Sequence, residues 1–137
     1  YINLKNYYRK KGVNMFDVYK FFDMVLSQNA LEIKKFFNED AYIDWHNTNE
    51  RFTIDEFIEV NCTYPDKWGG EVERVEQIGN LIIAVAKVIN VFDKSSFYVN
   101  SFILLENGKI SKLDEYWGDN GKIPQCRIIK NIGVKIK

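Results

Sequence analysis

The sequence LIIAVAKVINVFDKSSFYVNSFILLENGKISKLDEYW, residues 81–117, decides the fold. It contains three apolar runs rich in β-branched and aromatic residues, Leu81–Phe92, Phe97–Leu105 and Ile110–Trp117, which is typical of β-strands. Asn107-Gly108 lies between the last two runs and is the strongest hairpin signal in the chain, because these residue types adopt the positive φ angles of a tight turn. The stretch therefore predicts an antiparallel meander of three strands.

Both faces of these strands are apolar. In the first run, alternate positions carry Leu81, Ile83, Val85, Ile89 and Val91 on one face and Ile82, Ala84, Ala86, Val88 and Phe92 on the other. An antiparallel sheet with one face in water alternates apolar and polar residues instead. We therefore expect helices to cover one face and a second copy of the chain to cover the other, giving a homodimer through the sheet. A closed barrel, or a face covered by the chain ends, is the alternative.

Three short helices are predicted ahead of this sheet. Met15–Leu26 has apolar residues at helical spacing, and Ala30–Phe37 is expected to form a second helix. A third begins at Thr53, because Thr53 and Glu56 form a capping box, and it fades before Pro65. The fold class is α+β.

Two further strands are expected, Ala41–His46 and Glu71–Ile78. The alternation of the second slips between Val72 and Val75, which indicates a β-bulge. Residues 15–127 are expected to form one domain. Residues 128–137 are expected to form a basic C-terminal tail that can include a short strand.

The composition is that of an ordinary globular domain. The chain has 137 residues, with 19 basic and 19 acidic side chains. This balance argues against a nucleic-acid or anionic-membrane partner, since either requires a basic patch. Two cysteines and one histidine argue against a disulfide framework and a zinc site, and no apolar stretch reaches the ~20 residues of a membrane helix. We expect a cytoplasmic protein that uses no metal or cofactor.

The first fourteen residues, YINLKNYYRKKGVN, are basic and contain no acidic residue. The segment 10–15 can be encoded by a purine-rich ribosome-binding site followed by a start codon at Met15. We therefore expect residues 1–14 to be an N-terminal extension that arises as translated leader. A basic arm that binds a membrane or a partner is the alternative.

Several short segments, taken in order, resemble those of one known family. They are Phe37-Asn38-Glu39-Asp40-Ala41, Asp44-Trp45-His46, Tyr64-Pro65, Trp68 and Glu115-Tyr116-Trp117-Gly118-Asp119-Asn120-Gly121. Together with three helices before a sheet, they are similar to the SnoaL-like polyketide cyclase-related branch of uncharacterised bacterial proteins, within the nuclear transport factor 2-like superfamily. The resemblance spans about Phe16 to Arg127. It implies a strongly curved antiparallel sheet whose concave face forms a conical pocket beneath the three helices.

The resemblance implies a pocket for a small molecule but leaves its chemistry open, because this fold hosts isomerases, cyclases, epoxide hydrolases, dehydratases and binding proteins. Its enzymes generally place one carboxylate in the apolar cone, where desolvation raises the pKa, and a hydrogen-bond donor near the developing oxyanion. Two functions are therefore carried forward. One is a cofactor-free isomerase, cyclase or hydrolase acting on a small apolar molecule, and the other is a non-catalytic module that binds a small ligand or a protein.

Two adjacent carboxylates are candidates for the acid–base group. Asp114 and Glu115 point to opposite faces of the last strand, and Glu115 shares its face with Leu113 and Trp117. These apolar neighbours favour Glu115 as the carboxylate in the pocket, although a β-bulge would reverse the assignment. The alternative for each is a carboxylate in solvent or at a dimer interface.

Asp44 and His46 are a second candidate pair. They lie two residues apart on one side of a predicted strand, where a carboxylate can orient a histidine for acid–base chemistry. The alternative is a histidine at the rim that is hydrogen-bonded to the backbone.

Candidate ligand-binding residues come from the aromatic and amide side chains. Trp45, Trp68 and Trp117 are expected to form walls for a flat ligand, with core packing as the alternative. Tyr19, expected on the inner face of the first helix, offers a hydroxyl as oxyanion donor or fills the core. Asn100 interrupts an apolar strand, so we expect it either to hydrogen-bond a ligand or to lie in the dimer interface.

Overall fold

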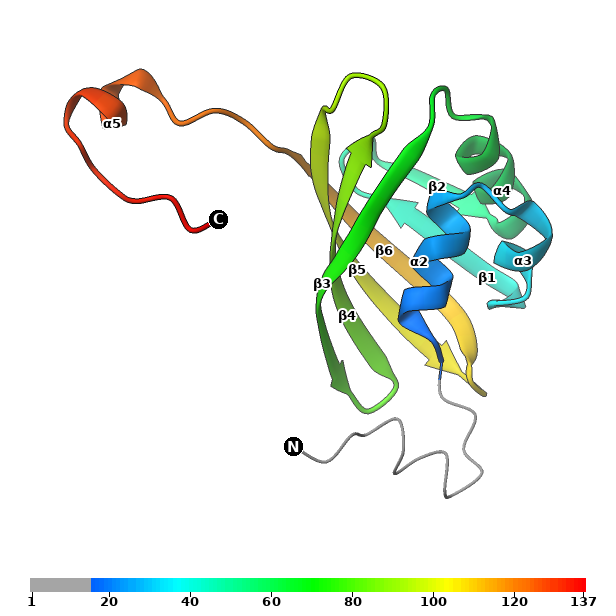
Figure 1. The fold of residues 1–137 in the computed structure, drawn as a ribbon. Coiled ribbons are helices and arrows are strands. Elements are labelled where there is room, and N and C mark those ends of the chain that lie inside the picture. Colours follow the sequence, from blue (N-terminus) through cyan, green and yellow to red (C-terminus); the bar gives the residue numbers. More distant parts are fainter. Residues whose placement is uncertain (1–15) are drawn as a thin grey trace.

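The computed structural model describes residues 16–137, in which an open six-stranded sheet carries α2, α3 and α4 on its concave side (Figure 1). The elements in chain order are α2 (Val18–Leu26), α3 (Ala30–Lys34), β1 (Phe37–Trp45), β2 (Glu50–Thr53), α4 (Ile54–Thr63), β3 (Trp68–Ile78), β4 (Leu81–Asn90), β5 (Ser96–Glu106), β6 (Lys109–Asp119) and α5 (Gln125–Ile129). The expectations for residues 1–14 and for a start at Met15 lie outside the described residues.

The strand order is β2-β1-β6-β5-β4-β3, and the sheet does not close into a barrel. The predicted α+β fold with a curved sheet is confirmed, but one pairing differs from the antiparallel expectation, because β1 runs parallel to β6. No hairpin joins these two strands, and the long connection between them permits a parallel pairing. The short strand β2, which the sequence did not indicate, pairs with β1.

Helix α2 begins at Asp17, whose side chain accepts a hydrogen bond from the backbone N–H of Lys20. Val18, Phe21 and Phe22 are buried on the side that faces the sheet. Tyr19 is 52% exposed, so its expected inner position is corrected. Phe21 is buried on the side of the helix where Tyr19 was expected.

Helix α3 is shorter than predicted. It ends at Lys34, and Phe37 already belongs to β1, so the expected helix over Ala30–Phe37 is corrected. The backbone N–H of Ile110 donates to the carbonyl of Phe36, so pairing with β6 takes over from the helix at this point. Phe16, Phe21, Phe36 and Phe37 pack their rings together beneath this join.

The local signals in the rest of the chain are confirmed. Thr53 and Glu56 form the reciprocal capping box, and α4 ends ahead of Pro65. The register of β3 against β4 shifts between Val72 and Arg74, where a bulge was expected. The turn between β5 and β6 is Asn107-Gly108, with both residues at positive φ.

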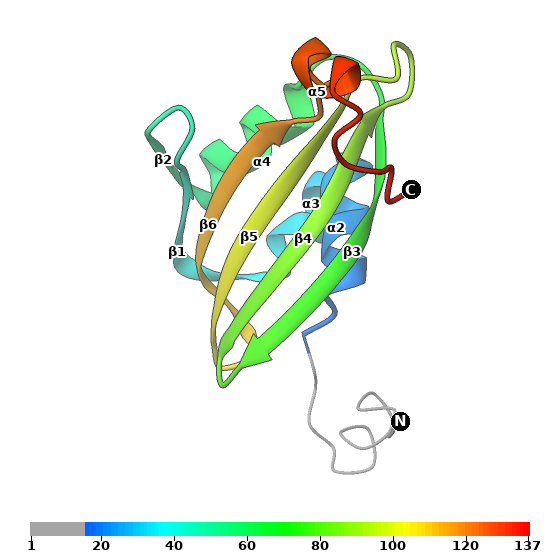
Figure 2. The same cartoon turned by 90° about the vertical axis from the view of Figure 1, so that its left-hand side faces the viewer.

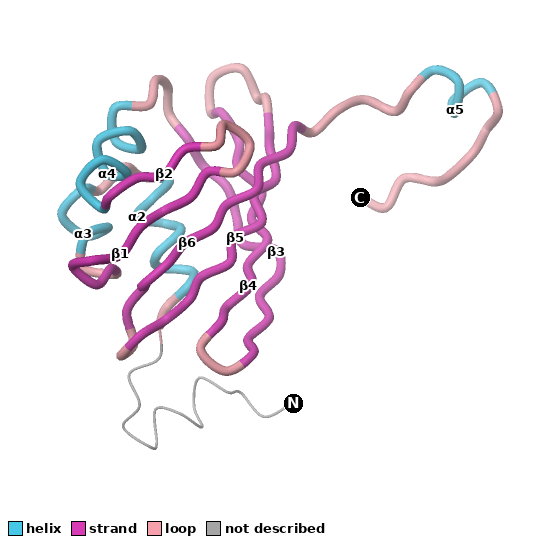
Figure 3. Tube along the Cα trace, turned by 180° about the vertical axis from the view of Figure 1, so that it is seen from behind, coloured by secondary structure: helices cyan, strands magenta, loops and turns pink. Residues whose placement is uncertain are grey.

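After β6 the chain leaves the sheet, and α5 lies away from it (Figures 1 and 3). Residues 120–137 are exposed throughout, and the short strand expected in the tail is corrected to a short helix, α5. None of the helices within residues 16–137 is long and apolar enough to cross a membrane.

The helices cover only one of the two faces of the sheet. We call the side packed against the helices the inner face; it holds buried residues such as Ile82, Ala84, Ala86, Val99 and Leu113. The opposite side, the outer face, is turned toward the viewer in Figure 2 with the helices behind it. Its apolar side chains are half-buried or exposed.

Candidate functional site

A cavity of about 400 Å³ lies where the C-terminal ends of α2 and α4 approach the inner face of the sheet. Its aromatic lining residues are Trp45, Tyr64, Trp68, Phe97 and Trp117. Its aliphatic lining residues are Val25, Leu26 and Val88, and its polar ones are Gln28, Asn47, Thr48, Asn61 and Asp119. This combination of apolar walls and a few polar groups is typical of a small-molecule site.

All three tryptophans of the chain line this cavity. Trp68 packs between Tyr64 and Phe97, with ring centroids 5.8 and 5.9 Å away. Trp45 packs its ring edge-on against Phe52 and Phe57. Two of the three tryptophans are therefore packed against neighbouring rings.

Glu115 lies on the inner face of β6, next to two residues that line the cavity, Trp45 and Trp117. Its Cα partners are Trp45 on β1 and Ser101 on β5, and it shares the inner side of β6 with Trp117. Its side chain is 4% exposed and does not itself line the cavity. Trp45 Nε1 donates to Oε2 at 2.9 Å, and Ser101 Oγ donates to Oε1 at 3.2 Å.

Burial raises the pKa of the Glu115 carboxyl to about 7, because the ionised form loses its hydration. Hydrogen bonding from Ser101, Trp45 and Trp117 acts in the opposite direction and limits the rise of the pKa. The result is a carboxyl that changes protonation state near neutral pH. That property suits a general acid or base.

The amide side chains of the lining residues are used to join segments of the protein. Gln28 Nε2 donates to the carbonyls of Asn61 and Tyr64, which ties the α2–α3 turn to the end of α4. Asn61 Nδ2 donates to the carbonyl of Val25. The side-chain amide of Asn47 donates to the carbonyl of Trp117 and accepts from its backbone N–H, as a neighbouring strand would.

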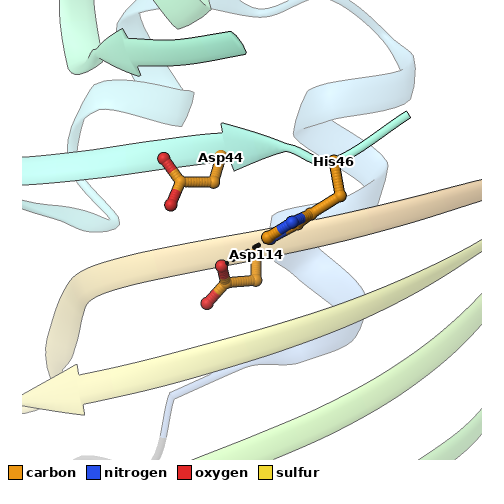
Figure 4. Close-up of side chains that lie close together, drawn as sticks. All are labelled: Asp44, His46 and Asp114. Atoms are coloured by element: carbon orange, nitrogen blue, oxygen red, sulfur yellow. Dashed lines mark hydrogen bonds and ion pairs between the residues drawn. The ribbon is translucent and has the colours of Figure 1, made fainter. Parts of the chain in front are cut away.

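Asp44, His46 and Asp114 lie together on the outer face, away from the cavity (Figure 4). His46 Nε2 lies 2.7 Å from Asp114 Oδ1, and Asp44 is held by two hydrogen bonds from Arg51. Arg51 thereby lowers the pKa of Asp44. Lys112 Nζ lies 3.1 Å from the other oxygen of Asp114.

Asp44, His46 and Asp114 each offer an atom that can bind a metal ion, and these atoms lie within 4.8 Å of one another. This is the one such group among the described residues. Arg51 and Lys112 each supply a positive charge to one of its carboxylates. Because the cations already pair with both acids, the geometry is explained by the ion pairs alone.

Several expectations for the site are corrected by these positions. Asp44 does not orient His46, since each has a different partner, and neither faces the cavity. Tyr19 and Asn100 do not line the cavity either: Tyr19 is exposed on α2, and Asn100 is exposed on the outer side of β5. Trp45, Trp68 and Trp117 do line it.

Other lining residues were missed. Asp119 belongs to the segment that resembles the family, and Tyr64 to another, so a signal existed for both. No sequence signal pointed to Gln28, Asn47 and Asn61, because each is placed at the cavity by contacts with residues that are distant in sequence.

Comparisons with known proteins give the fold. No family model matches the sequence, and no curated protein is similar to it. A protein proposed to be a ketosteroid isomerase, from Kribbella flavida, aligns with a TM-score of 0.71 at 18% identity, over 86% of this chain and 85% of its own. A nuclear transport factor 2-like protein of unknown function from Burkholderia xenovorans aligns with a TM-score of 0.70 at 21% identity, over 85% and 90%.

A protein proposed to be a polyketide cyclase, from Sinorhizobium meliloti, aligns with a TM-score of 0.60 at 17% identity, over 70% of this chain and 89% of its own. At these identities the similarity establishes the fold alone. The chain has the nuclear transport factor 2-like fold, as its resemblance to the SnoaL-like branch implied.

Proposed function

We propose that the chain binds a small, largely apolar molecule in the cavity and transfers a proton on it, with Glu115 as the acid–base group. The observation that carries this proposal is the carboxyl of Glu115, which is 4% exposed and has a pKa of about 7 beside an aromatic cavity. The reaction class is that of an isomerase, cyclase or hydrolase. Solved structures of the same fold that are proposed to be a ketosteroid isomerase and a polyketide cyclase support this class.

In this proposal the ligand lies against the indoles of Trp45 and Trp117, which are neighbours of Glu115 on β1 and on β6. The ionised carboxylate takes a proton from the carbon next to a carbonyl group, and the carboxyl then returns it to a neighbouring position. Ser101 and Trp45 each hold one carboxyl oxygen, which fixes the orientation of the group during both steps.

The test is proton exchange on an enolisable ketone. The full chain is incubated with β-tetralone in deuterated buffer, and deuterium incorporation beside the carbonyl is followed by NMR. We expect exchange above the buffer rate with the wild-type chain, a loss of at least tenfold with Glu115→Gln, and no change with Glu106→Gln, which alters an exposed carboxyl at the far end of β5. Exchange that survives Glu115→Gln would show that this carboxyl is not the base.

A non-catalytic binding module is the second candidate. The observation that favours it is that Glu115 does not itself line the cavity, so a ligand can be held by the aromatic walls without touching the carboxyl. Binding of β-tetralone without any exchange would select this function.

We also propose that the chain forms a homodimer through the outer face. Leu104 and Tyr116 on this face are each 42% exposed, and Ile83, Val85 and Phe102 are only half-buried. The open sheet excludes the closed-barrel alternative, and the exposed residues 120–137 provide no cover, apart from contacts of Lys137 with Glu73 and Tyr98. A second copy is the partner whose surface matches, because a two-fold interface brings the same apolar patch against itself.

A further inference from the structure

We propose that the cavity is built for an organic cation, a molecule whose apolar body carries one alkylammonium group. This inference rests on the proposed function only in placing the ligand in the same cavity. It adds the charge class of the ligand, which follows from three properties of the lining residues: their charge, their hydrogen-bond donors and their rings.

The first property is charge. Asp119 is the only side chain that is charged at neutral pH among the described residues that line the cavity. No lysine, arginine or histidine accompanies it there, and no ion pair to Asp119 is formed within residues 16–137. Asp119 is exposed and lies at the last position of β6, two residues beyond Trp117, without a salt bridge to any described cation.

The second property is that several hydrogen-bond donors of the lining are already used within the protein. Gln28 Nε2 uses both its hydrogens on the carbonyls of Asn61 and Tyr64, which leaves its oxygen as an acceptor. The amide nitrogens of Asn47 and Asn61 also donate to backbone carbonyls. The polar atoms that remain for a ligand include the side-chain oxygens of Gln28 and Asp119, beside the hydroxyls of Thr48 and Tyr64.

The indoles follow the same pattern. Trp45 Nε1 donates to Glu115, and Trp68 Nε1 donates to the carbonyl of Pro65 at 2.8 Å. These two N–H groups therefore point into the protein rather than toward a ligand. A ligand with a positive charge suits such a lining better than one with a negative charge, because Asp119 is the only charged side chain in it.

The third property is the set of ring faces. Five aromatic residues line the cavity, and Tyr64, Trp68 and Phe97 form a continuous row of ring contacts. The negative face of an aromatic ring attracts an ammonium group, with tryptophan the strongest partner, and a cage of such rings recognises methylated ammonium groups. Aromatic walls, one unpaired carboxylate and acceptor oxygens are together the chemistry of a cation site.

The experiment compares two ligands of the same shape that differ only in charge, 3-(trimethylammonio)phenol and 3-tert-butylphenol. Because every tryptophan of the chain lines the cavity, quenching of intrinsic tryptophan fluorescence reports on this site alone. We expect the cation to bind on the order of tenfold more tightly than its neutral isostere. The Asp119→Asn variant is expected to lose several-fold in affinity for the cation while its affinity for the neutral ligand is unchanged.

The matched control is Asp40→Asn, the same chemical change at an exposed position of β1 that does not line the cavity; both affinities are expected to stay as in the wild-type chain. Equal or tighter binding of 3-tert-butylphenol would overturn the inference and leave the proposed function intact, since a neutral apolar ligand then fits. Binding of neither ligand would count against the cavity itself, and therefore against both proposals. An equal loss of cation affinity in the two aspartate variants would show that general surface charge, not Asp119, attracts the ligand.

Discussion

Trp45 Nε1 donates a hydrogen bond of 2.9 Å to Oε2 of Glu115, although the two residues are 70 positions apart in the chain. They are Cα partners on the parallel strands β1 and β6, so the sheet itself brings them together. One end of the indole forms a wall of the cavity, and the other holds a buried carboxyl. The ring that lines the cavity therefore also affects the pKa of the proposed acid–base group.

This bond predicts the effect of Trp45→Phe on the pKa of Glu115. The bond favours the ionised form, so its removal is expected to raise the pKa above about 7. The pKa is measured by NMR titration of the carboxyl carbon, identified by its disappearance in Glu115→Gln. Trp68→Phe is the matched control, because the Trp68 indole donates to Pro65 and should leave the pKa unchanged. An unchanged pKa in Trp45→Phe would contradict the assigned role of the bond.

Glu115 also predicts how stability depends on pH. Its pKa is raised from 4.5 to about 7 on folding, so the folded chain retains a proton that the unfolded chain releases. The free energy of unfolding contributed by this group is therefore largest below about pH 4.5 and falls as the pH rises toward about 7, by about 3 kcal/mol in all.

Urea unfolding of wild-type and Glu115→Gln chains at about pH 5 and about pH 8 measures this effect. The variant is expected to lose this part of the pH dependence, whereas Glu106→Gln should keep the wild-type difference. If the difference in unfolding free energy between the wild-type chain and Glu115→Gln does not change with pH, the pKa of the carboxyl is not raised.

The proposed homodimer predicts the effect of a charge on the outer face. Leu104→Lys places an ammonium group on the apolar outer face and is expected to convert the proposed dimer to a monomer. Leu31→Lys is the matched control, since Leu31 is 82% exposed on α3, on the other side of the sheet. Native mass spectrometry or light scattering gives the mass of each species. A wild-type chain that is monomeric at all concentrations would refute the interface.

The capping box predicts a stability effect at the start of α4. Thr53→Ala removes the acceptor for the Glu56 backbone N–H and is expected to cost about 1 kcal/mol of unfolding free energy. Because Glu56 returns a bond to the Thr53 backbone, the two residues form one unit. The double variant with Glu56→Ala should therefore cost less than the two single changes added together. Strict additivity in urea unfolding would show that the two bonds act separately.

Features that depend on neighbours in sequence were predictable from the sequence. The start of α4 follows from Thr53 and Glu56, the β5–β6 turn from Asn107-Gly108, and the bulge in β3 from a break in alternation. The position of Glu115 on the inner face also agrees with its apolar neighbours, while its catalytic role stays a prediction.

Features that depend on contacts between distant segments were not predictable. The spacing of Asp44 and His46 suggested a pair, but Arg51 and Asp114 are nearer partners, and both are placed by other strands. The parallel pairing of β1 with β6 leaves no local pattern, because no turn connects the two strands. The cavity amides Gln28 and Asn61 likewise meet only once α2 and α4 have packed.

The opposite orientation of Asp114 and Glu115 on β6 makes the site more sensitive to insertion than to substitution. Successive strand residues alternate between the faces, so one residue added after Asn107 and before Leu113 would exchange the two carboxyls between the inner and the outer face. The tight turn at Asn107-Gly108 fixes the count of residues that prevents this exchange. Relatives that diverge at this hairpin by an odd number of residues, without a compensating bulge, would be expected to carry their buried acid one position away from this one.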